Sequence, residues 1–387
     1  MLDNRAAAKV KGRPLNTLGK ARKAVDTAMV VTLMLLLLAG LLVLFSATYY
    51  TAQDHGDALG EVKEQLIGIG LGFVALLVTS RVPFSFWRKP WVVLTGLGAS
   101  AVLLVLVLIP GIGVYLNGSR RWLNLAGLSF QPSELCKFAM VIFLATALTN
   151  GGDAVKSLFK GILPLMALPA FFFLLILEQP NLSTAMSLLM VSGVMVLIAG
   201  AKWKHLGLMG VAGVAAGLFY AWSEPYRRER LLSFRDPFAK MGDEGYQLAQ
   251  SLIAFGSGGL FGMGLGQGRQ KYAYLPYPES DFIFAIVGED FGLLGCLVVI
   301  ALFTAFTFIG MRIAVTCKDK FGCLLAAGIT AMISIQAFLN MGVVVGLLPT
   351  TGLPLPFFSK GGTSISIMMA AVGILLNVSR SCERNLS

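Results

Sequence analysis

The sequence is poor in charge, in histidine and in cysteine. Only 13% of its 387 residues are charged, against about 25% in an ordinary soluble domain, whereas 56% are hydrophobic. The two histidines, His55 and His205, and the lack of HExxH and GxSxG motifs exclude metallohydrolase and Ser–His mechanisms. The glycine-rich segment 256–270 lacks the GK[ST] end of a phosphate-binding loop. We interpret it as a flexible or closely packed loop.

The cysteines predict neither a disulfide nor a zinc site. All five lie in apolar runs or on the side predicted to face the cytoplasm, namely Cys136, Cys296, Cys317, Cys323 and Cys382. Disulfides are rare in the reducing cytosol, so none is expected. Cys317 and Cys323 lack a CxxC partner and a nearby histidine, which makes zinc binding improbable.

Long uncharged apolar runs dominate the chain. A spanning helix needs about 20 apolar residues, and Met29–Phe45 and Trp91–Ile109 contain no charge. Ten such spans are predicted, at 25–49, 65–80, 90–109, 132–149, 160–178, 183–200, 205–222, 282–311, 321–347 and 362–379. The sequence therefore predicts an all-α polytopic membrane protein with about ten transmembrane helices.

The net charge of +11 reflects topology rather than a nucleic-acid partner. If the N-terminus is cytoplasmic, the inner segments hold most of the basic residues and few of the acidic ones, as the positive-inside rule requires. Both termini are therefore predicted to be cytoplasmic. Residues 1–24 are expected to form a disordered cytoplasmic arm without a cleavable signal, 25–380 the transmembrane domain and 381–387 a cytoplasmic tail.

Three outer segments are longer than the other connections. They cover 110–132, 348–364 and a large loop at 223–281, which we expect to be ordered because it contains apolar patches. No inverted repeat is visible, which disfavours the common transporter architectures.

Ionisable residues inside predicted spans are costly and mark candidate functional positions, here Glu134, Lys137, Glu178, Glu289 and Asp290. Glu134 and Lys137 are three residues apart and share a helix face. They form either a buried ion pair that only joins helices or part of a polar cleft that opens outward. Asp281 lies where the large loop re-enters the membrane. It is either a partly desolvated general base or an ordinary helix N-cap.

Arg120, Arg121 and Trp122 place two cations beside an aromatic ring on the outer side, against the positive-inside trend. The three residues form either an interfacial anchor or a clamp for phosphate oxygens. Further outer cations are Arg227, Arg228, Arg230 and Lys271. Together they favour an anionic headgroup as ligand.

Three segments in order carry a family resemblance: GSRRWLNLAGLSFQPSELCKFAMVIFLA, GSGGLFGMGLGQGRQKYAYLPYPESDFIFAIVGEDFGLLG and LPTTGLPLPFFSKGGTS. From about residue 25 onward the chain resembles the SEDS family of bacterial membrane peptidoglycan polymerases, of the FtsW, RodA and SpoVE type. The resemblance implies that Asp281 is the essential carboxylate. It also implies that the substrate-binding residues include Arg120, Arg121, Trp122, Glu134 and Lys137. To these we add Lys271, as an outer cation, and Ser359 and Lys360, which lie beside the expected cleft, as candidate substrate-binding residues. Two motifs depart from the family pattern, with Asn181 and Ser183 in one and Lys360 in the other.

The resemblance implies a glycosyltransferase that polymerises lipid II at the outer face of the bacterial cytoplasmic membrane. It favours a role in division or sporulation over elongation. The implied partners are a class B penicillin-binding protein and other divisome or elongasome membrane proteins. No cofactor is required by protein motifs, and a divalent cation is compatible with the pyrophosphate of the substrate. The alternatives are a lipid II flippase and a non-catalytic division scaffold.

Overall fold

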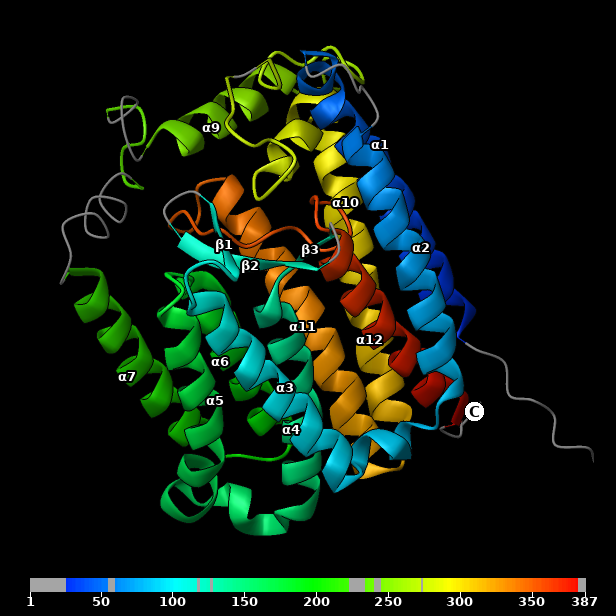
Figure 1. The fold of residues 1–387 in the computed structure, drawn as a ribbon, viewed down its shortest axis with the longest axis vertical. Helices are drawn as coiled ribbons and strands as arrows, with labels where there is room; N and C mark the ends of the chain where they lie inside the picture. Colours follow the sequence, from blue (N-terminus) through cyan, green and yellow to red (C-terminus); the bar gives the residue numbers. More distant parts are fainter. Residues whose placement is uncertain are drawn as a thin grey trace, which may run out of the picture.

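The computed structural model describes residues 26–54, 60–116, 119–125, 128–222, 234–239, 245–272 and 274–381. They form a bundle of long, roughly parallel and antiparallel helices with a small sheet that lies across its middle (Figure 1). The predicted N-terminal arm at 1–24 and the predicted tail, apart from Ser381, lie outside the described residues.

Each predicted span coincides with a helix of the structure. The helices are α1 (Thr27–Asp54), α2 (Gly60–Arg81), α3 (Pro90–Leu108), α4 (Pro132–Asn150), α5 (Leu163–Leu177), α6 (Leu182–Ile198), α7 (Trp203–Trp222), α10 (Ile283–Thr316), α11 (Lys320–Val344) and α12 (Gly362–Ser381). Short helical turns precede α3 and α5, namely η1 (Phe84–Arg88), η2 (Gly152–Lys156) and η3 (Leu158–Ile162). Among the described residues, eight helices are long and apolar enough to cross a membrane, and α6 is a shorter apolar helix.

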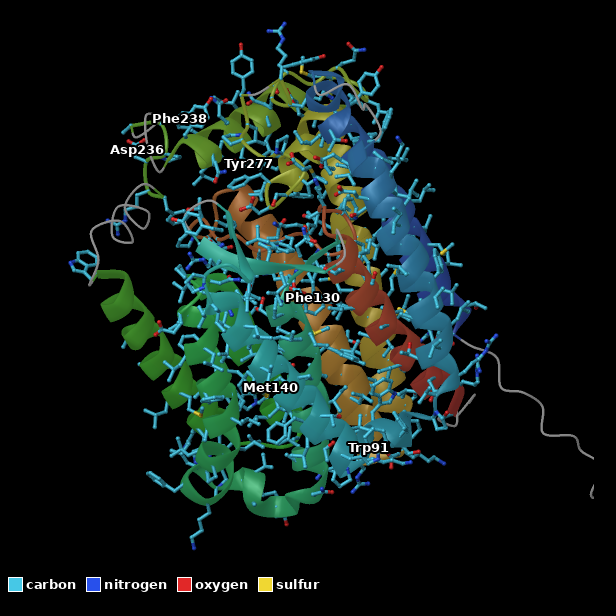
Figure 2. All side chains as sticks on the ribbon, in the orientation of Figure 1. Trp91, Phe130, Met140, Asp236, Phe238 and Tyr277 are labelled. Carbon is cyan, nitrogen blue, oxygen red and sulfur yellow. The ribbon has the colours of Figure 1, made fainter. Side chains whose placement is uncertain are left out.

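The centre of the bundle is formed by α4, α11 and α12. In the apolar stretch of each of these helices, 72%, 72% and 67% of the residues are buried, respectively. The corresponding shares in α3 and α5 are 17% and 22%. Figure 2 shows side chains that project outward from the helices at the edges of the bundle. Glu134 and Lys137 of α4 and Gln336 and Asn340 of α11 therefore lie inside the protein.

The predicted outer segment 110–132 contains a sheet that the sequence analysis did not anticipate. Strands β1 (Gly113–Leu116), β2 (Ser119–Leu125) and β3 (Leu128–Phe130) pair antiparallel in that order. The sheet lies across the bundle near the start of α4 (Figure 1). The sequence did contain a hairpin signal, because Asn117–Gly118 is flanked by residues with high β propensity.

The large loop carries a helix, α9 (Tyr246–Gly258), and packs against a break in α10. Gly292 has φ 65° and ψ −163°, which interrupts the helix. Loop backbone replaces the lost hydrogen bonds, because Leu293 N donates to Gly259 O and Met263 N donates to Glu289 O, both at 2.9 Å. The glycine-rich segment is thus closely packed, one of the two predicted possibilities.

One cysteine departs from the prediction. Cys317, which follows the end of α10, is disulfide-bonded. Cys136, Cys296 and Cys323 are free. The prediction that no disulfide forms is therefore wrong for Cys317, because residue spacing does not show which helix ends and loops the fold brings together.

Candidate functional site

Asp281 lies two residues before the start of α10, half-buried, and a side chain of α11 holds its backbone. The Asn340 amide of α11 donates to Asp281 O at 2.6 Å and to Leu353 O at 2.7 Å. The N-cap position of α10 is occupied by Phe282, so Asp281 is not the N-cap residue. The interpretation of Asp281 as an ordinary helix N-cap is therefore wrong.

Arg121 and Asp281 face the same small space. A methyl group placed on Gly352 would lie 3.8 Å from Arg121 Nη1 and 3.9 Å from Asp281 Oδ2. The guanidinium is held by carbonyl oxygens, since Arg121 Nε donates to Gln179 O at 3.1 Å and Nη2 donates to Pro180 O. A cation and a carboxylate therefore converge where the 348–361 segment passes between β2 and α10.

The two neighbouring arginines do not form one clamp. Successive side chains of a strand point to opposite faces, and Arg120 lies over the Tyr115 ring, 5.4 Å from its centroid. Trp122 is half-buried and lies opposite Val114 in the hairpin. The expectation of a doubled cation at one ligand is corrected accordingly, and Arg121 is the arginine that faces Asp281.

Glu134 and Lys137 form an ion pair of 2.8 Å whose side chains are 3% and 2% exposed. Lys137 Nζ also donates to Gln336 Oε1 of α11, and Gln336 Nε2 donates to Pro354 O at 2.9 Å. The pair therefore links the first turns of α4 to α11 and to the segment that passes Asp281. Its position is compatible with both predicted roles, a structural link and a wall of a polar cleft.

Several buried polar atoms of these elements have no hydrogen-bond partner among the described residues. They are Gln131 Oε1, Ser133 Oγ, Asn340 Oδ1 and Thr351 Oγ1. Buried polar atoms in native proteins are nearly always paired, so unpartnered ones call for a bound ligand or water. They come from the start of α4, from α11 and from the segment beside Asp281. Either water or the hydroxyl groups of a ligand would satisfy them.

Lys271 lies apart from the other predicted substrate-binding cations. Its side chain is 2% exposed, and its Nζ lies 3.1 Å from Asp290 Oδ1 and 2.8 Å from Ser46 Oγ. Glu289 accepts a hydrogen bond from Arg269 N at 2.6 Å. These contacts tie the glycine-rich segment to α1 and α10. The sequence analysis grouped Lys271 with the ligand cations by charge alone, whereas its burial makes it an anchor.

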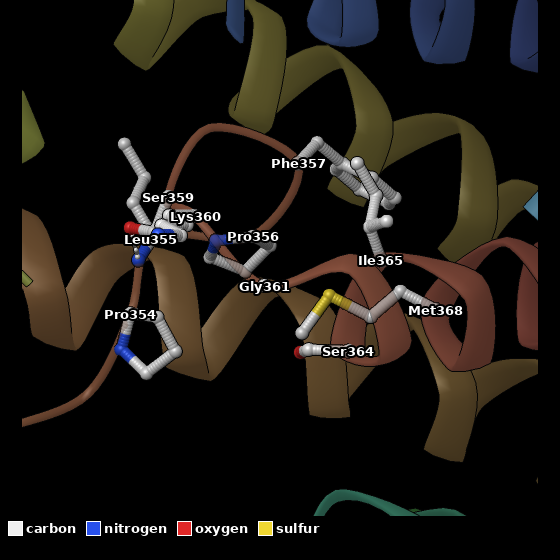
Figure 3. Close-up of a pocket in the computed structure, with 10 residues that line it drawn as sticks. All are labelled: Pro354, Leu355, Pro356, Phe357, Ser359, Lys360, Gly361, Ser364, Ile365 and Met368. Carbon is white, nitrogen blue, oxygen red and sulfur yellow. Dashed lines mark hydrogen bonds between the residues drawn. The ribbon is translucent and has the colours of Figure 1, made fainter. Parts of the chain in front are cut away.

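Ser359 and Lys360 lie in the turn before α12 (Figure 3). Ser359 Oγ accepts from Leu355 N at 2.8 Å and donates to Ser280 O, so it fixes the residue that precedes Asp281. Lys360 Nζ pairs with Glu61 Oε2 of α2 at 2.8 Å. The cation that departs from the family pattern thus holds α2 against this turn.

Two titratable groups beside this turn have shifted pKa values. Burial raises the pKa of Glu279, with a further contribution from the charge of Glu61. For Lys360, burial lowers the pKa, but the hydrogen bond to Glu61 and the charges of Glu61, Glu64 and Glu279 outweigh it and raise the pKa overall. Lys360 thus stays cationic next to the segment that carries Asp281.

The other departure from the family pattern preserves its local structure. Asn181 is the N-cap of α6, and its Oδ1 accepts from Thr184 N at 3.2 Å. Asparagine and aspartate are equally good N-caps. Ser183 lies in the first turn of the same helix. The loss of the acid therefore leaves the start of α6 intact.

Sequence reasoning missed two polar residues of the site, Gln336 and Asn340. They are four residues apart inside the apolar helix α11 and so lie on one face. Both are 1% exposed and contact the segment next to Asp281. Amides at this spacing in an apolar span were the available signal. The predicted ligand residues Arg227, Arg228 and Arg230 lie outside the described residues, and in the described part no group of three metal-ligating side chains occurs.

The chain is similar to known proteins over nearly its whole length. The profile of the FtsW, RodA and SpoVE family, described as "Cell cycle protein", matches residues 26–384. Stage V sporulation protein E of Bacillus subtilis is 42% identical over 356 residues, which cover 92% of this chain and 97% of that protein. A probable peptidoglycan glycosyltransferase FtsW of Geobacter sp. is 38% identical over 354 residues, 91% and 96% of the two chains.

Two solved structures resemble the fold. A chain from a study of polymerization and crosslinking by a peptidoglycan synthase complex gives a TM-score of 0.78 at 28% identity, with 94% of this chain and 99% of that chain covered. The rod shape determining protein RodA of Thermus thermophilus gives 0.66 at 26% identity, with the same coverage.

Proposed function

Because the chain belongs to the FtsW, RodA and SpoVE family of cell cycle proteins, we propose that it is a peptidoglycan glycosyltransferase that polymerises lipid II. Relatives that share about two fifths of its residues over nearly their whole length carry that activity, or a sporulation role, in their names. They also favour a role in division or sporulation over elongation.

The observation that carries the proposal is the convergence of Asp281 and Arg121 beside Gly352. A glycosyl transfer needs a base for the attacking hydroxyl and positive charge for the departing pyrophosphate. The two side chains supply one group of each kind at one place. The unpartnered polar atoms of α4, α11 and the 348–361 segment add hydrogen-bonding capacity for sugar hydroxyls.

In the proposed reaction, Asp281 accepts the proton of the acceptor GlcNAc 4-hydroxyl. The oxygen attacks C1 of the donor MurNAc, the bond from C1 to the pyrophosphate oxygen breaks, and the undecaprenyl pyrophosphate leaves with the bonding electrons. Attack opposite the leaving group inverts the configuration at C1. The charge that develops on the pyrophosphate is stabilised by Arg121, with Lys137 contributing from the buried pair.

The site is proposed to face outward, with both chain termini cytoplasmic. The charge distribution supports this orientation, because the helix ends opposite Asp281 carry Arg88, Lys202, Arg312, Lys320 and Arg380. A class B penicillin-binding protein transpeptidase is the proposed partner. The similarity to a chain of a peptidoglycan synthase complex supports that pairing.

The test is polymerisation in detergent, where no bilayer separates two compartments. Purified protein is incubated with lipid II, with and without the transpeptidase partner, and the products are resolved on a gel. We expect a ladder of glycan strands. A protein that moves fluorescent lipid II across vesicle membranes but makes no strands in detergent would instead be a flippase. One that does neither would be a scaffold.

A further inference from the structure

An apolar groove of ≈ 690 Å³ lies between α3, α4 and α5, at the end of the bundle away from Asp281. Its walls include Val93, Leu97 and Ala101 of α3 and Phe172 of α5. Arg88 and Asn150 line it where α3 begins and α4 ends. We refer to it as the α3–α5 groove. None of the residues assigned to the catalytic site lines it.

The dimensions of the α3–α5 groove match one membrane leaflet. The α3 residues that line it run from Pro90 to Ala101, which corresponds to about 16 Å at 1.5 Å per residue. One leaflet contributes about 15 Å of hydrocarbon. Trp91 and Phe159 are 57% and 77% exposed at the same end, as expected for aromatic side chains at the membrane interface.

The mouth of the α3–α5 groove is cationic. Arg88 Nη2 donates to Asn150 Oδ1 at 2.7 Å, which holds the guanidinium at the rim. Within the described part of the chain Arg88 forms no ion pair, so its remaining N–H groups have no carboxylate partner there. Lys89 follows directly, with its Nζ 5.2 Å from the centroid of the Phe86 ring. An apolar slot one leaflet deep thus ends at one lining cation, Arg88, with Lys89 next to it in the chain.

We propose that the α3–α5 groove binds an anionic phospholipid of this leaflet, which the charge distribution predicts to be the cytoplasmic one. One acyl chain fills the slot between α3 and α5, and the phosphate accepts hydrogen bonds from the Arg88 guanidinium. The charge complementarity selects an anionic lipid over a zwitterionic one, because a net negative headgroup pairs with Arg88 and is also attracted by the charge of the adjacent Lys89. The lipid donor of the proposed reaction reacts at the opposite end of the bundle, so this lipid is a separate ligand.

Gly98 allows the acyl-chain part of the proposal to be tested without disturbing the fold. It lines the groove, and a Cβ added to it meets no atom within 4 Å. Gly98→Leu therefore adds an apolar side chain to the slot at a position where its Cβ meets no neighbouring atom. The matched control is Gly70→Leu, because Gly70 is exposed on α2, has equally open surroundings and does not line the groove.

The headgroup part is tested by Arg88→Gln, with Lys202→Gln as a control for lost charge at the same end of the bundle. Native mass spectrometry of the detergent-purified protein, titrated with phosphatidylglycerol or phosphatidylcholine, measures the lipid retained. We expect one phosphatidylglycerol to bind the wild type and both controls. Arg88→Gln should weaken it about tenfold, as for a lost charge-assisted hydrogen bond. Gly98→Leu should reduce it to the level of phosphatidylcholine.

Equal retention of the two lipids by the wild type would overturn the proposal, as would unchanged phosphatidylglycerol binding by both Gly98→Leu and Arg88→Gln. A photoreactive residue at Leu94, which lines the groove and is 68% exposed, gives an independent measurement in native membranes. We expect a phospholipid adduct. A protein adduct in its place would show that a partner helix occupies the groove, and would contradict the assignment.

Discussion

Because the Glu134–Lys137 pair is buried, substituting only one of its members is expected to lower the free energy of unfolding strongly. Removing one partner of a buried pair leaves an uncompensated charge and typically costs about 3–5 kcal/mol. Both side chains are at most 3% exposed, so Lys137→Met alone mixes a stability effect with any effect on catalysis. A second substitution that also removes the acid separates the two effects.

We expect Lys137→Met to lower both the thermal stability in detergent and the rate of lipid II polymerisation. The double variant Glu134→Gln, Lys137→Met removes both charges and should regain most of the lost Tm without regaining polymerisation. Recovery of the rate together with the Tm would show that the pair only joins helices and that Lys137 does not stabilise the pyrophosphate.

The raised pKa of Glu279 leads us to predict that the stability of the folded protein depends on pH. Because burial raises its pKa above the ordinary value, the folded protein binds this proton more tightly than the unfolded chain. The resulting stabilisation is complete below the ordinary glutamate pKa and is lost as the pH rises through the raised value. Glu279→Gln stays neutral, so its Tm relative to wild type should rise between pH 4 and pH 7. Glu64→Gln, on an exposed side chain, is the control, and parallel Tm curves for Glu279→Gln and wild type would refute the effect.

At the scale of elements, the break in α10 depends on Gly292. Its φ of 65° and ψ of −163° belong to a region that is essentially open to glycine alone, and a side chain there costs about 1–3 kcal/mol. A Cβ on Gly292 would also lie 2.4 Å from Gly262 N and 2.6 Å from Leu260 O. These are backbone atoms of the loop that completes the hydrogen bonding of α10.

Gly292→Ala should therefore destabilise the protein by more than the conformational cost alone and should lower polymerisation, because α10 begins just after Asp281. Gly70→Ala, in open surroundings within α2, should be neutral or slightly stabilising, since alanine favours a helix. The comparison is made by thermal unfolding in detergent. Equal Tm values for the two variants would contradict the role assigned to the break.

The helices could be predicted from hydropathy because a membrane span is a local property of about 20 residues. The break at Gly292 could not, since it depends on backbone groups of the segment 259–264, which lies some thirty residues earlier in the chain. Arg120 and Arg121 are a second case. They are adjacent in the sequence, but their side chains point to opposite faces of β2, as successive side chains of a strand do. Gln336 and Asn340 were within reach of sequence reasoning, as amides on one face of an apolar helix.

At the scale of the whole molecule, the proposed orientation has a direct test. In a background without the five native cysteines, Phe238→Cys introduces a thiol at an exposed position in the 223–281 loop. It should react with a membrane-impermeant reagent in intact spheroplasts. Lys320→Cys, at the start of α11, should react only after lysis. The reverse pattern would invert the topology and place Asp281 on the cytoplasmic side.

The most direct measurement of the central claim compares wild type with Asp281→Asn in the detergent polymerisation assay. Asparagine keeps the size of the side chain and the backbone contacts to Asn340 but cannot accept the proton of the attacking hydroxyl. The account predicts an unchanged Tm and a rate of strand formation lower by about 10²–10⁴, as for the loss of a general base. Near-normal polymerisation by Asp281→Asn, with or without the transpeptidase partner, would contradict it.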